Sequence, residues 1–327
     1  MVKHVTRLSL YRLRNGVCDS KPYAVFDGYY GEERETPYSL YLGEEGAEGW
    51  YSTPSAKVAA SDRWGDGKHP VQAEQVFYES KTAVFHCVAV DRREPFNRAH
   101  NAWIPALSGV SQIVRARFED SPYSDDKTRI LDGSFDTFMD GYITVDIPES
   151  PAHRAFSEFE ITLTANNPRR FAWTPMSAEM NATEKRGGSG LEYGEHATGL
   201  KYPLSYGVLS WTHRAILKNE GTARSWPIFR VQGAFADGVK LLFSDNTGQK
   251  NYWLQYPNPL SSFDVLVFDC ANERAFLNGS DVTRNLEHRQ FPCVESSARF
   301  GDNAHLTCEL ASSGTGKVVC EVRNAYL

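Results

Sequence analysis

The nine histidines could hold a metal, but their spacing does not favour one. They are His4, His69, His86, His100, His153, His196, His213, His288 and His305. No two form a His-Glu-x-x-His pair, which would place both imidazoles on one face of a helix. A zinc site assembled from distant histidines is the alternative that the spacing leaves open. We therefore expect scattered surface or strand histidines, and no cofactor.

Two glycine-rich tetrapeptides resemble functional loops but lack residues that such loops need. A phosphate loop ending at residues 314–317 would need glycine where Ala311 stands and serine or threonine where Val318 stands. A nucleophile elbow at residues 187–190 would need its final glycine where Leu191 stands. Both tetrapeptides are therefore predicted to be turns.

Paired carboxylates could hydrolyse a glycosidic bond, since β-sandwich glycosidases place two acids across a cleft. One group of candidates stands in acidic loop and strand-edge sequence, and a second flanks a single apolar strand, whose solvated ends it could mark. The first group is Asp132, Asp136, Asp140 and Asp146, and the second is Asp264 and Asp269. Because 41 acidic residues make chance pairs frequent, we do not expect an enzyme.

Exposed aromatic side chains could instead bind sugar or another protein through their large apolar faces. Tyr252, Leu254 and Tyr256 alternate along one predicted strand, and Leu254 between them indicates that this face is core. The next side chain, Trp253, points to the opposite face. The candidate interface or glycan-contact aromatics are Trp50, Tyr51, Trp226 and Trp253. The alternative is that they fill the core or an interface, as most large aromatics do.

Length and charge restrict the class of protein. The 327 residues suit two domains, and a hydrophobic content of 41% allows each domain to bury a core. The formal net charge of −6 argues against nucleic-acid binding, which needs a basic surface. No window approaches the ~20 apolar residues of a membrane helix, so no membrane insertion is expected. The N-terminal sequence lacks the apolar core of a signal peptide, which implies synthesis in the cytoplasm.

The six cysteines are predicted to be mostly reduced core residues, because cysteine behaves as a small hydrophobe. They are Cys18, Cys87, Cys270, Cys293, Cys308 and Cys320, and no two form a Cys-x-x-Cys pair. A disulfide between Cys308 and Cys320 is the alternative if their two strands pair.

Alternation of apolar and polar residues dominates the chain and predicts a mainly β protein. The predicted strands are residues 75–78, 81–90, 111–118, 141–147, 158–165, 227–232, 239–243, 252–256, 264–268, 274–277, 305–310 and 317–322. One short helix is predicted at residues 95–107, where Pro95 suits the first turn. Two stretches, residues 43–49 and 181–199, are rich in glycine and charge and are predicted to be loops.

The predicted strands fall into two domains, residues 1–212 and 213–327. From Trp226 onward, short strands recur with turns between them, which indicates a β-sandwich. Asn278-Gly279 is a strong signal for a tight hairpin turn.

Two long passages of the sequence resemble the distal tail proteins of long-tailed phages. In the first, residues 140–173, an alternating strand ends in Ala-Asn-Asn-Pro-Arg-Arg-Phe, with Asn167 where the family usually has aspartate. In the second, residues 217–282, an Asn-x-Gly-Thr-Ala turn precedes a proline-led strand, an apolar strand and an Asn-Gly turn. The segments around Trp50-Tyr51 and at residues 323–327 are similar to the minor tail proteins of actinobacteriophages.

This resemblance implies a structural role at the tip of a siphovirus tail. A ring-forming N-terminal β-barrel or sandwich domain with one short helix would be followed by a galectin-like β-sandwich. Family members form a hexameric ring that joins the tail tube and tape-measure protein to the tail-tip hub and receptor-binding proteins. The family has no catalytic motif to map. Two alternatives stay open: a carbohydrate-binding β-sandwich that recognises the host envelope, and a β-sandwich glycoside hydrolase.

Overall fold

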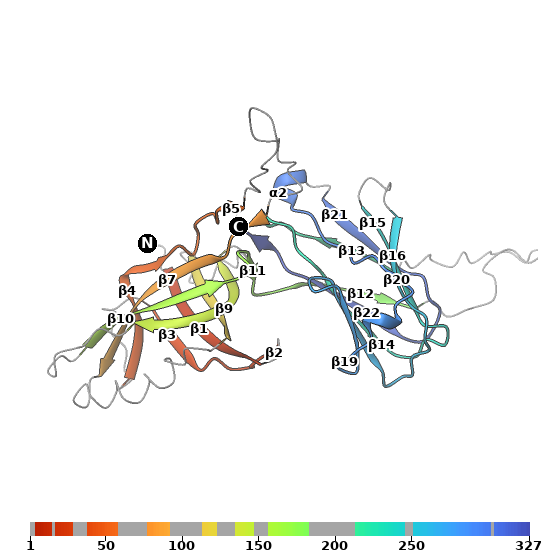
Figure 1. Ribbon diagram of the computed structural model, residues 1–327, viewed down its shortest axis with the longest axis horizontal. Coiled ribbons are helices and arrows are strands. Elements are labelled where there is room, and N and C mark those ends of the chain that lie inside the picture. Colours follow the sequence, from red (N-terminus) through yellow and green to blue (C-terminus); the bar gives the residue numbers. More distant parts are fainter. Residues whose placement is uncertain are drawn as a thin grey trace, which may run out of the picture. The chain divides into compact units, whose positions relative to one another are not determined.

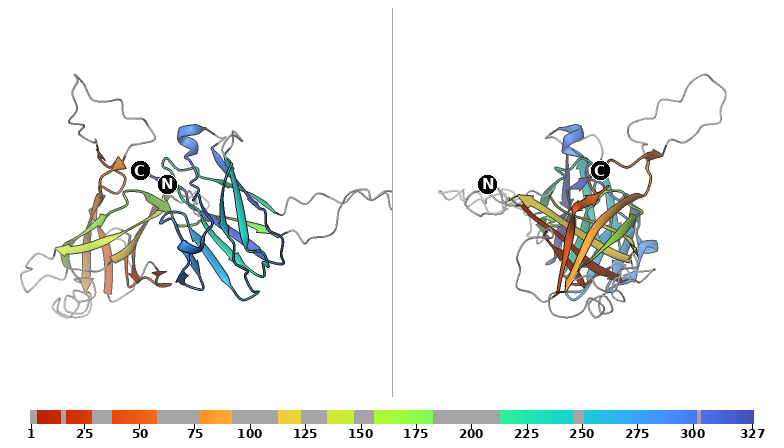
Figure 2. Two further views of the ribbon diagram at one scale, coloured as in Figure 1. Left: turned by 45° about the vertical axis from the view of Figure 1, so that its right-hand side comes forward. Right: turned by 90° about the vertical axis from the view of Figure 1, so that its left-hand side faces the viewer.

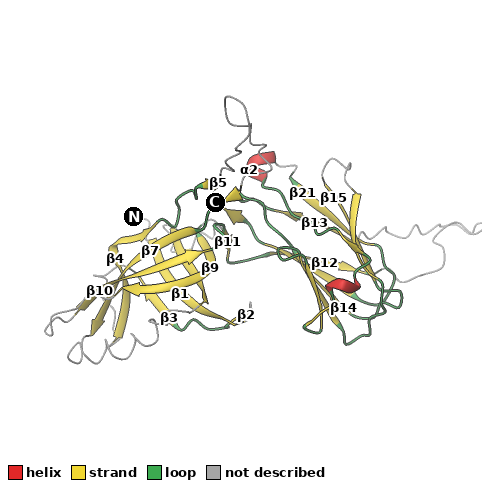
Figure 3. Ribbon diagram, viewed as in Figure 1, coloured by secondary structure: helices red, strands yellow, loops and turns green. Residues whose placement is uncertain are grey.

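The computed structural model divides the chain into two compact units, residues 1–173 with 326–327 and residues 174–325. It describes residues 4–14, 17–28, 38–57, 77–91, 113–122, 135–146, 156–182, 213–245, 251–301 and 304–327. Within these residues the chain is mainly strand, and helix is confined to two short segments, η2 (Thr283–Asn285) and α2 (Ser297–Phe300) (Figure 3). The helix predicted at residues 95–107 and most of the loop predicted at 181–199 lie outside the described residues.

The first unit is built on one 10-stranded sheet with the order β2-β1-β8-β9-β10-β7-β4 (Figure 1). Strand β3 also pairs with β1, β11 with β9, and β23 with β11. The strands are β1 (His4–Arg14), β2 (Val17–Cys18), β3 (Ala24–Asp27), β4 (Tyr38–Glu48), β7 (Lys81–Asp91), β8 (Ile113–Pro122), β9 (Asp136–Asp146), β10 (Phe156–Ala165), β11 (Arg170–Ala172) and β23 (Ala325–Tyr326). A separate two-stranded sheet joins β5 (Ala56–Lys57) to β6 (Phe77–Tyr78).

This sheet curls into a barrel around its own core. The backbone N–H of Leu42 in β4 donates to the carbonyl oxygen of Gly28, just after β3, at 3.0 Å. That bond joins the two ends of the path from β3 to β4, and Figure 2 shows the curvature of these strands. Strand β10 shows the alternation expected from its sequence, because Phe159, Ile161 and Leu163 are buried and the residues between them face outward. Of the predicted barrel or sandwich, the first unit is therefore the barrel, and its predicted alternating strand is confirmed.

The acidic segment at residues 43–49 is largely strand, which corrects the predicted loop. It forms the end of β4, where Leu42 faces Cys87 but Ala47 faces Phe85, so the register shifts between them. Gly46, inside the shift, has a φ of 65°, a value that glycine adopts without steric cost. The glycines therefore form a bulge within the strand.

The second unit is a β-sandwich of two sheets, as predicted (Figures 1 and 2). The 6-stranded sheet has the order β12-β22-β14-β17-β18-β19, and the 5-stranded sheet has the order β13-β21-β15-β16-β20. The strands are β12 (Met176–Asn181), β13 (Arg214–Lys218), β14 (Ile228–Gln232), β15 (Val239–Asp245), β16 (Asn251–Tyr256), β17 (Val265–Asp269), β18 (Arg274–Leu277), β19 (Ser280–Asp281), β20 (His288–Arg289), β21 (His305–Leu310) and β22 (Lys317–Val322).

Turn residues close this sandwich as their chemistry predicts. Asn278 and Gly279 both have positive φ, 50° and 85°, and link β18 to β19 in the predicted hairpin. Asn219, which is fully buried, accepts hydrogen bonds from the backbone N–H groups of Gly221 and Ala325 at 3.1 Å each. Its amide also donates to the carbonyl of Ala223 at 2.6 Å. The Asn-x-Gly-Thr-Ala turn therefore ties together backbone segments that are far apart in the sequence.

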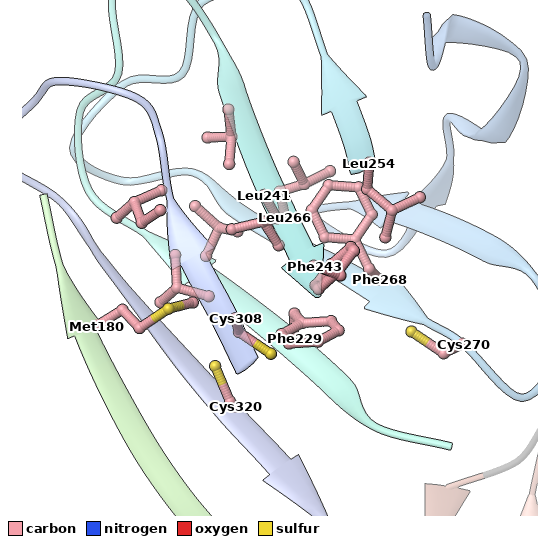
Figure 4. Close-up of a cluster of buried hydrophobic side chains, with 14 of the residues drawn as sticks. Met180, Phe229, Leu241, Phe243, Leu254, Leu266, Phe268, Cys270, Cys308 and Cys320 are labelled. Carbon is pink, nitrogen blue, oxygen red and sulfur yellow. The ribbon is translucent and has the colours of Figure 1, made fainter. Parts of the chain in front are cut away.

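The cysteines are all free, as expected of reduced core residues. Cys308 in β21 and Cys320 in β22 come from the two facing sheets, and Figure 4 shows their side chains pointing toward one another in the second core. Burial raises the pKa of Cys308 well above its ordinary value, so the group stays a neutral thiol. Cys87 and Cys270 are also buried, and the other two are half-buried.

The two units divide between Trp173 and Thr174, earlier in the chain than the boundary near residue 212 that the sequence analysis gives. The physical reason is β12, which pairs with β22 from Met176 to Asn181. Its Met180 is fully buried in the second core. A strand that precedes the glycine-rich stretch thus belongs to the sandwich that follows it.

Candidate interface surfaces

Four of the six candidate carboxylates make structural contacts, namely Asp136, Asp140, Asp264 and Asp269. Asp264 accepts hydrogen bonds from the backbone of Ser261 and from Asn278, and these bonds hold its pKa below the ordinary value. Asp269 accepts from the backbone N–H groups of Ala271 and Asn272. Both acids therefore stabilise turns at opposite ends of β17. The described residues contain no cluster of three metal-binding side chains, and Asp132 lies outside them.

Asp136 and Asp140 belong to a row of ion pairs on the outer face of the barrel, which we call the arginine ladder. Arg117 makes two bonds of 2.8 Å to Asp136, and Arg115 makes bonds of 2.7 and 2.8 Å to Asp140. Arg117 also reaches Glu119 at 3.2 Å. Each arginine thus donates two hydrogen bonds to a carboxylate on the neighbouring strand, and these ion pairs join β8 to β9.

Aromatic rings cover the ladder. The guanidinium of Arg115 lies 4.0 Å from the ring centroid of Phe138, and that of Arg117 lies 4.4 Å from the ring of Trp173. Trp173 also stacks on Tyr11 at 5.2 Å and meets Phe138 edge-on at 5.9 Å. Cations above aromatic faces are stabilised by the charge distribution of the ring. The outer face of the barrel therefore has a packed second layer of its own.

One end of the ladder is exposed and apolar. Ile113 and Tyr142 face each other across β8 and β9, and their exposed fractions are 60% and 43%. They stand next to the charged pair of Arg115 and Asp140 along the same face. An apolar pair beside charged groups is a composition that protein interfaces favour, since it joins a hydrophobic centre to a polar rim. We call Ile113 and Tyr142 the exposed pair.

Of the candidate aromatics in the first unit, Trp50 lies in the core. It is fully buried, packs edge-on against Phe118 at 5.5 Å, and donates its indole N–H to Thr137 at 3.3 Å. Gly49 makes this placement possible, because it has a φ of +77° and a side chain there would meet the Thr82 carbonyl oxygen at 2.6 Å. Trp50 is therefore not available for contact with a partner or a glycan.

Tyr51, the next residue, is on the surface, with an exposed fraction of 44%. The guanidinium of Arg170 lies 4.7 Å from its ring centroid and 5.7 Å from that of Tyr326, so two tyrosines lie against one arginine. Arg170 is itself buried, and burial lowers its pKa. Tyr51 thus makes a cation–π contact at the surface of the first unit.

In the second unit, Trp253 lies on the outward face of β16 as predicted, while Leu254 and Tyr256 are buried. Its ring lies 4.5 Å from His288, and the ammonium of Lys240 lies 5.1 Å from its centroid. Trp226 is half-buried and packs against the second core. Trp253 is therefore the better placed of the two for an external contact.

Sequence reasoning missed two features of these surfaces. The first is the arginine ladder, whose signal is two cations two residues apart, Arg115 and Arg117, and two acids four residues apart, Asp136 and Asp140. Such charges share a face and meet only if their strands are neighbours in register. The second is Phe263, which is 91% exposed in a turn before β17 and carries no pattern that distinguishes it from a core residue.

The comparisons with known proteins concern the fold. No family model and no curated protein matches this chain. The crystal structure of the SPP1 Dit (gp 19.1) protein, described as a paradigm of the hub adsorption apparatus in phages that infect Gram-positive bacteria, is 11% identical. The match covers 98% of this chain and 99% of that one, with a TM-score of 0.50.

Two structures of the phage p2 baseplate in its activated conformation, with Sr and with Ca, give TM-scores of 0.48 and 0.44 at 10% identity. These two matches cover 97% and 98% of this chain, and each covers 98% of the baseplate chain. None of the helices in the described residues is long and apolar enough to span a bilayer. At 11% identity the likeness to SPP1 Dit shows a shared fold that covers nearly the whole of both chains.

Proposed function

We propose that this protein is a structural component of a phage tail tip, with no enzymatic activity, that assembles into a ring. The observation that carries the proposal is the fold likeness to the SPP1 Dit protein, which extends over 98% of this chain and so includes both units. The distal-tail motifs around Asn167 and Asn219 point the same way, and both form the turns that their chemistry predicts. Two unrelated observations, overall fold and local motif, thus support one role.

The surfaces of the first unit suit self-assembly. A ring is closed by heterologous contacts, so each subunit needs two different surfaces. The exposed pair offers an apolar patch on the outer face of the sheet, and Tyr51 offers an aromatic one at the end of β4. We propose the exposed pair as one half of the contact, because burying two large apolar side chains contributes about 2 kcal/mol each.

The ring would connect the tail tube and tape-measure protein to the tail-tip hub and receptor-binding proteins. It would be made in the host cytoplasm and would end up in the virion. The second unit, residues 174–325, would face outward as a galectin-like sandwich. These partners are testable by co-assembly with isolated tail tubes.

The test is the mass of the purified protein, measured by light scattering across a concentration series and by negative-stain imaging of the same fractions. A ring of about six subunits is the expected result. Ile113→Asp should lower the assembled fraction, because it places a charge in the proposed contact. The matched control, Ile216→Asp, changes an exposed isoleucine of the second unit, in β13, and should leave assembly intact. A monomer at every concentration, both alone and with tail tubes, would overturn the proposal.

A second candidate function is recognition of a host glycan by the second unit. It is favoured by Trp253, whose ring lies on the outward face of β16 beside Lys240 and His288. A sugar stacked on this ring should change tryptophan fluorescence, and Trp253→Ala should abolish the change. Trp226→Phe is the control, because Trp226 packs against the core. No fluorescence change across a glycan panel would remove this candidate.

A further inference from the structure

An asparagine followed by a glycine forms the hairpin turn between β18 and β19 in the second unit. Asn278 and Gly279 stand between Leu277 and Ser280, which pair with each other, and both turn residues are exposed. A side chain built at Gly279 would meet no atom of the described residues within 4 Å. The turn is therefore open to water and to reactions that need it.

Asparagine before glycine can react with its own backbone and lose its side-chain amide. The backbone nitrogen of Gly279 would attack Cγ of Asn278, so that a new N–Cγ bond closes a cyclic succinimide and the Cγ–Nδ2 bond breaks. The side-chain nitrogen leaves as ammonia and takes up the proton that the backbone nitrogen gives up. Water then opens the ring to aspartate or isoaspartate, without an oxidant or a reductant. Glycine favours the attack because it has no Cβ to obstruct it.

The folded chain holds the amide of Asn278 on the neighbouring strand. Its Oδ1 accepts from the backbone N–H of Val265 at 2.9 Å, and its Nδ2 donates to Oδ1 of Asp264 at 2.8 Å. Both partners stand where β17 begins, and the backbone N–H of Asn278 donates to the carbonyl of Val265 at 2.9 Å as well. Cγ therefore cannot turn toward the nitrogen of Gly279 unless two side-chain hydrogen bonds break.

The carboxylate of Asp264 is itself held in position for this bond. Its Oδ2 accepts from the backbone N–H of Ser261 at 2.8 Å, which leaves Oδ1 for Asn278. The bonds from Ser261 and Asn278 lower the pKa of Asp264, so the carboxylate is ionised at neutral pH and its bond to the amide is charge-assisted. Deamidation would put a second carboxylate in place of this donor, and the two negative charges would repel each other.

We propose that Asn278 is a deamidation site that the fold suppresses, and that Asp264 is the residue that suppresses it. In the unfolded chain both side-chain hydrogen bonds are absent, so the amide reacts as it would in a free Asn-Gly peptide. In the folded chain it reacts only while the amide is released from β17. The sequence contains a second such pair, Asn15-Gly16, which serves as a reference in the unfolded chain. The site stands independently of the proposed tail role, because its residues lie within one unit.

The test is the rate at which Asn278 loses its amide, measured by mass spectrometry of the tryptic peptide 275–284 while the full chain is incubated at mildly basic pH. In denaturing urea Asn278 should react at a rate similar to that of Asn15, and in native buffer it should react far more slowly. Asp264→Ala should speed the native reaction about tenfold, the factor that one charge-assisted hydrogen bond contributes. Asp269→Ala removes the carboxylate that holds the turn at the other end of β17, and as the matched control it should leave the rate unchanged.

Two further measurements separate local release of the amide from unfolding. Asp264→Asn keeps an uncharged acceptor and should give an intermediate rate, and the rate in Asp264→Ala should not change with urea below the unfolding transition. Asn278→Asp, which reproduces the product, should lower the thermal midpoint more than Asn278→Gly, which loses the same bonds but adds no charge. Equal rates at Asn278 in native buffer and in urea would overturn the proposal. A rate in Asp264→Ala equal to that of the parent, or one that rises with urea as the chain unfolds, would also overturn it.

Discussion

Trp50 and Tyr51 are adjacent in the chain, yet their side chains meet opposite environments. The positive φ of Gly49 turns the backbone so that the indole enters the barrel and the phenol stays outside. Trp50 then fills the space between Phe85 and Phe118 and satisfies its N–H through Thr137. A buried indole that meets its hydrogen-bonding need in this way is a core residue, while the ring of Tyr51 next to it lies on the surface against Arg170.

Replacing Trp50 should therefore lower the free energy of unfolding of the first unit, while replacing Tyr51 should not. We expect Trp50→Ala to lower the free energy of unfolding of the first unit by about 3–5 kcal/mol, because it leaves a cavity. Trp50→Phe keeps a ring but leaves Thr137 without its donor, and should cost less than the alanine change. Urea titrations followed by far-ultraviolet circular dichroism measure both, with Tyr51→Ala as the control. Equal losses of unfolding free energy in Trp50→Ala and Tyr51→Ala would contradict the placement of Trp50 in the core and Tyr51 on the surface.

Lys81 makes stability depend on pH in a direction that can be worked out. Its pKa falls from the ordinary 10.5 to about 8 in the folded state, mainly through desolvation, so between these values the unfolded chain binds more protons. Stability therefore rises with pH across that window. The folded state carries its full penalty below pH 8 and loses it above the ordinary pKa of lysine, a change of roughly 3 kcal/mol.

The measurement is the difference in unfolding free energy between the parent chain and Lys81→Met, at steps from pH 7 to pH 10.5. Other titrating groups are common to both proteins and cancel. We expect the unfolding free energy of the parent chain to increase relative to that of the variant as the pH rises. Lys21→Met, an exposed lysine, should give a flat difference and serves as the control. A flat difference for Lys81→Met would show that its ammonium is solvated in the folded protein.

At the scale of elements, the arginine ladder shows how two strands are held in register by more than their backbones. Arg115 faces Asp140 and Glu119 faces Asp136 across β8 and β9, so a slip of one residue would move every partner to the other face. Half-buried ion pairs with two hydrogen bonds each are more directional than apolar contacts. The ladder therefore specifies the pairing of β8 with β9.

A double-mutant cycle on Arg117 and Asp136 tests this role. Arg117→Met and Asp136→Asn should each destabilise the first unit, and the coupling energy between them should be about 1–3 kcal/mol, because the pair is shielded from water. The matched comparison is Lys317 with Glu179, an exposed pair at 2.9 Å, which should show no coupling beyond error. Coupling at Arg117 that salt abolishes would contradict the shielded geometry.

The alternation of side chains allowed the strands to be predicted but gave little information on what they pair with. Every predicted strand overlaps an observed one, because a face that is buried must be apolar at every second position. Strands such as β1 and β12 were missed, since charged and small residues interrupt their apolar faces. The arginine ladder was also missed. Arg117 and Asp136 stand 19 positions apart, and only the pairing of β8 with β9 brings them together.

At the scale of the whole molecule, the two units are separate in their cores but interleaved along the chain. Residues 326–327 belong to the first unit, although they follow the last residues of the second. The second unit is therefore an insertion between β11 and the chain's final residues, and both of its ends are fixed. β12 opens the insertion at one end, and Ala325, bonded to Asn219 and Ala223, closes it at the other.

This arrangement predicts which fragments of the second unit fold. A fragment of residues 174–325 contains β12 and should unfold cooperatively. A fragment of residues 183–325 lacks β12, which leaves the edge of β22 unpaired and removes Met180 from the core. Burying a methionine side chain contributes about 2 kcal/mol, and an unpaired edge strand invites aggregation, so this fragment should melt at a lower temperature and self-associate. Residues 213–325, which begin at the boundary that the sequence analysis gives, should share that defect.

Circular dichroism melts and size-exclusion chromatography of the three fragments decide the matter. The comparison of 174–325 with 183–325 is the critical one, because both keep residues 183–212 and differ only by β12 and its approach. Met180→Ala in the longer fragment separates the two causes: it should lower the midpoint without promoting association, since the edge of β22 stays paired. Three fragments with the same midpoint would mean that β12 does not stabilise the sandwich, and that the second unit begins after it.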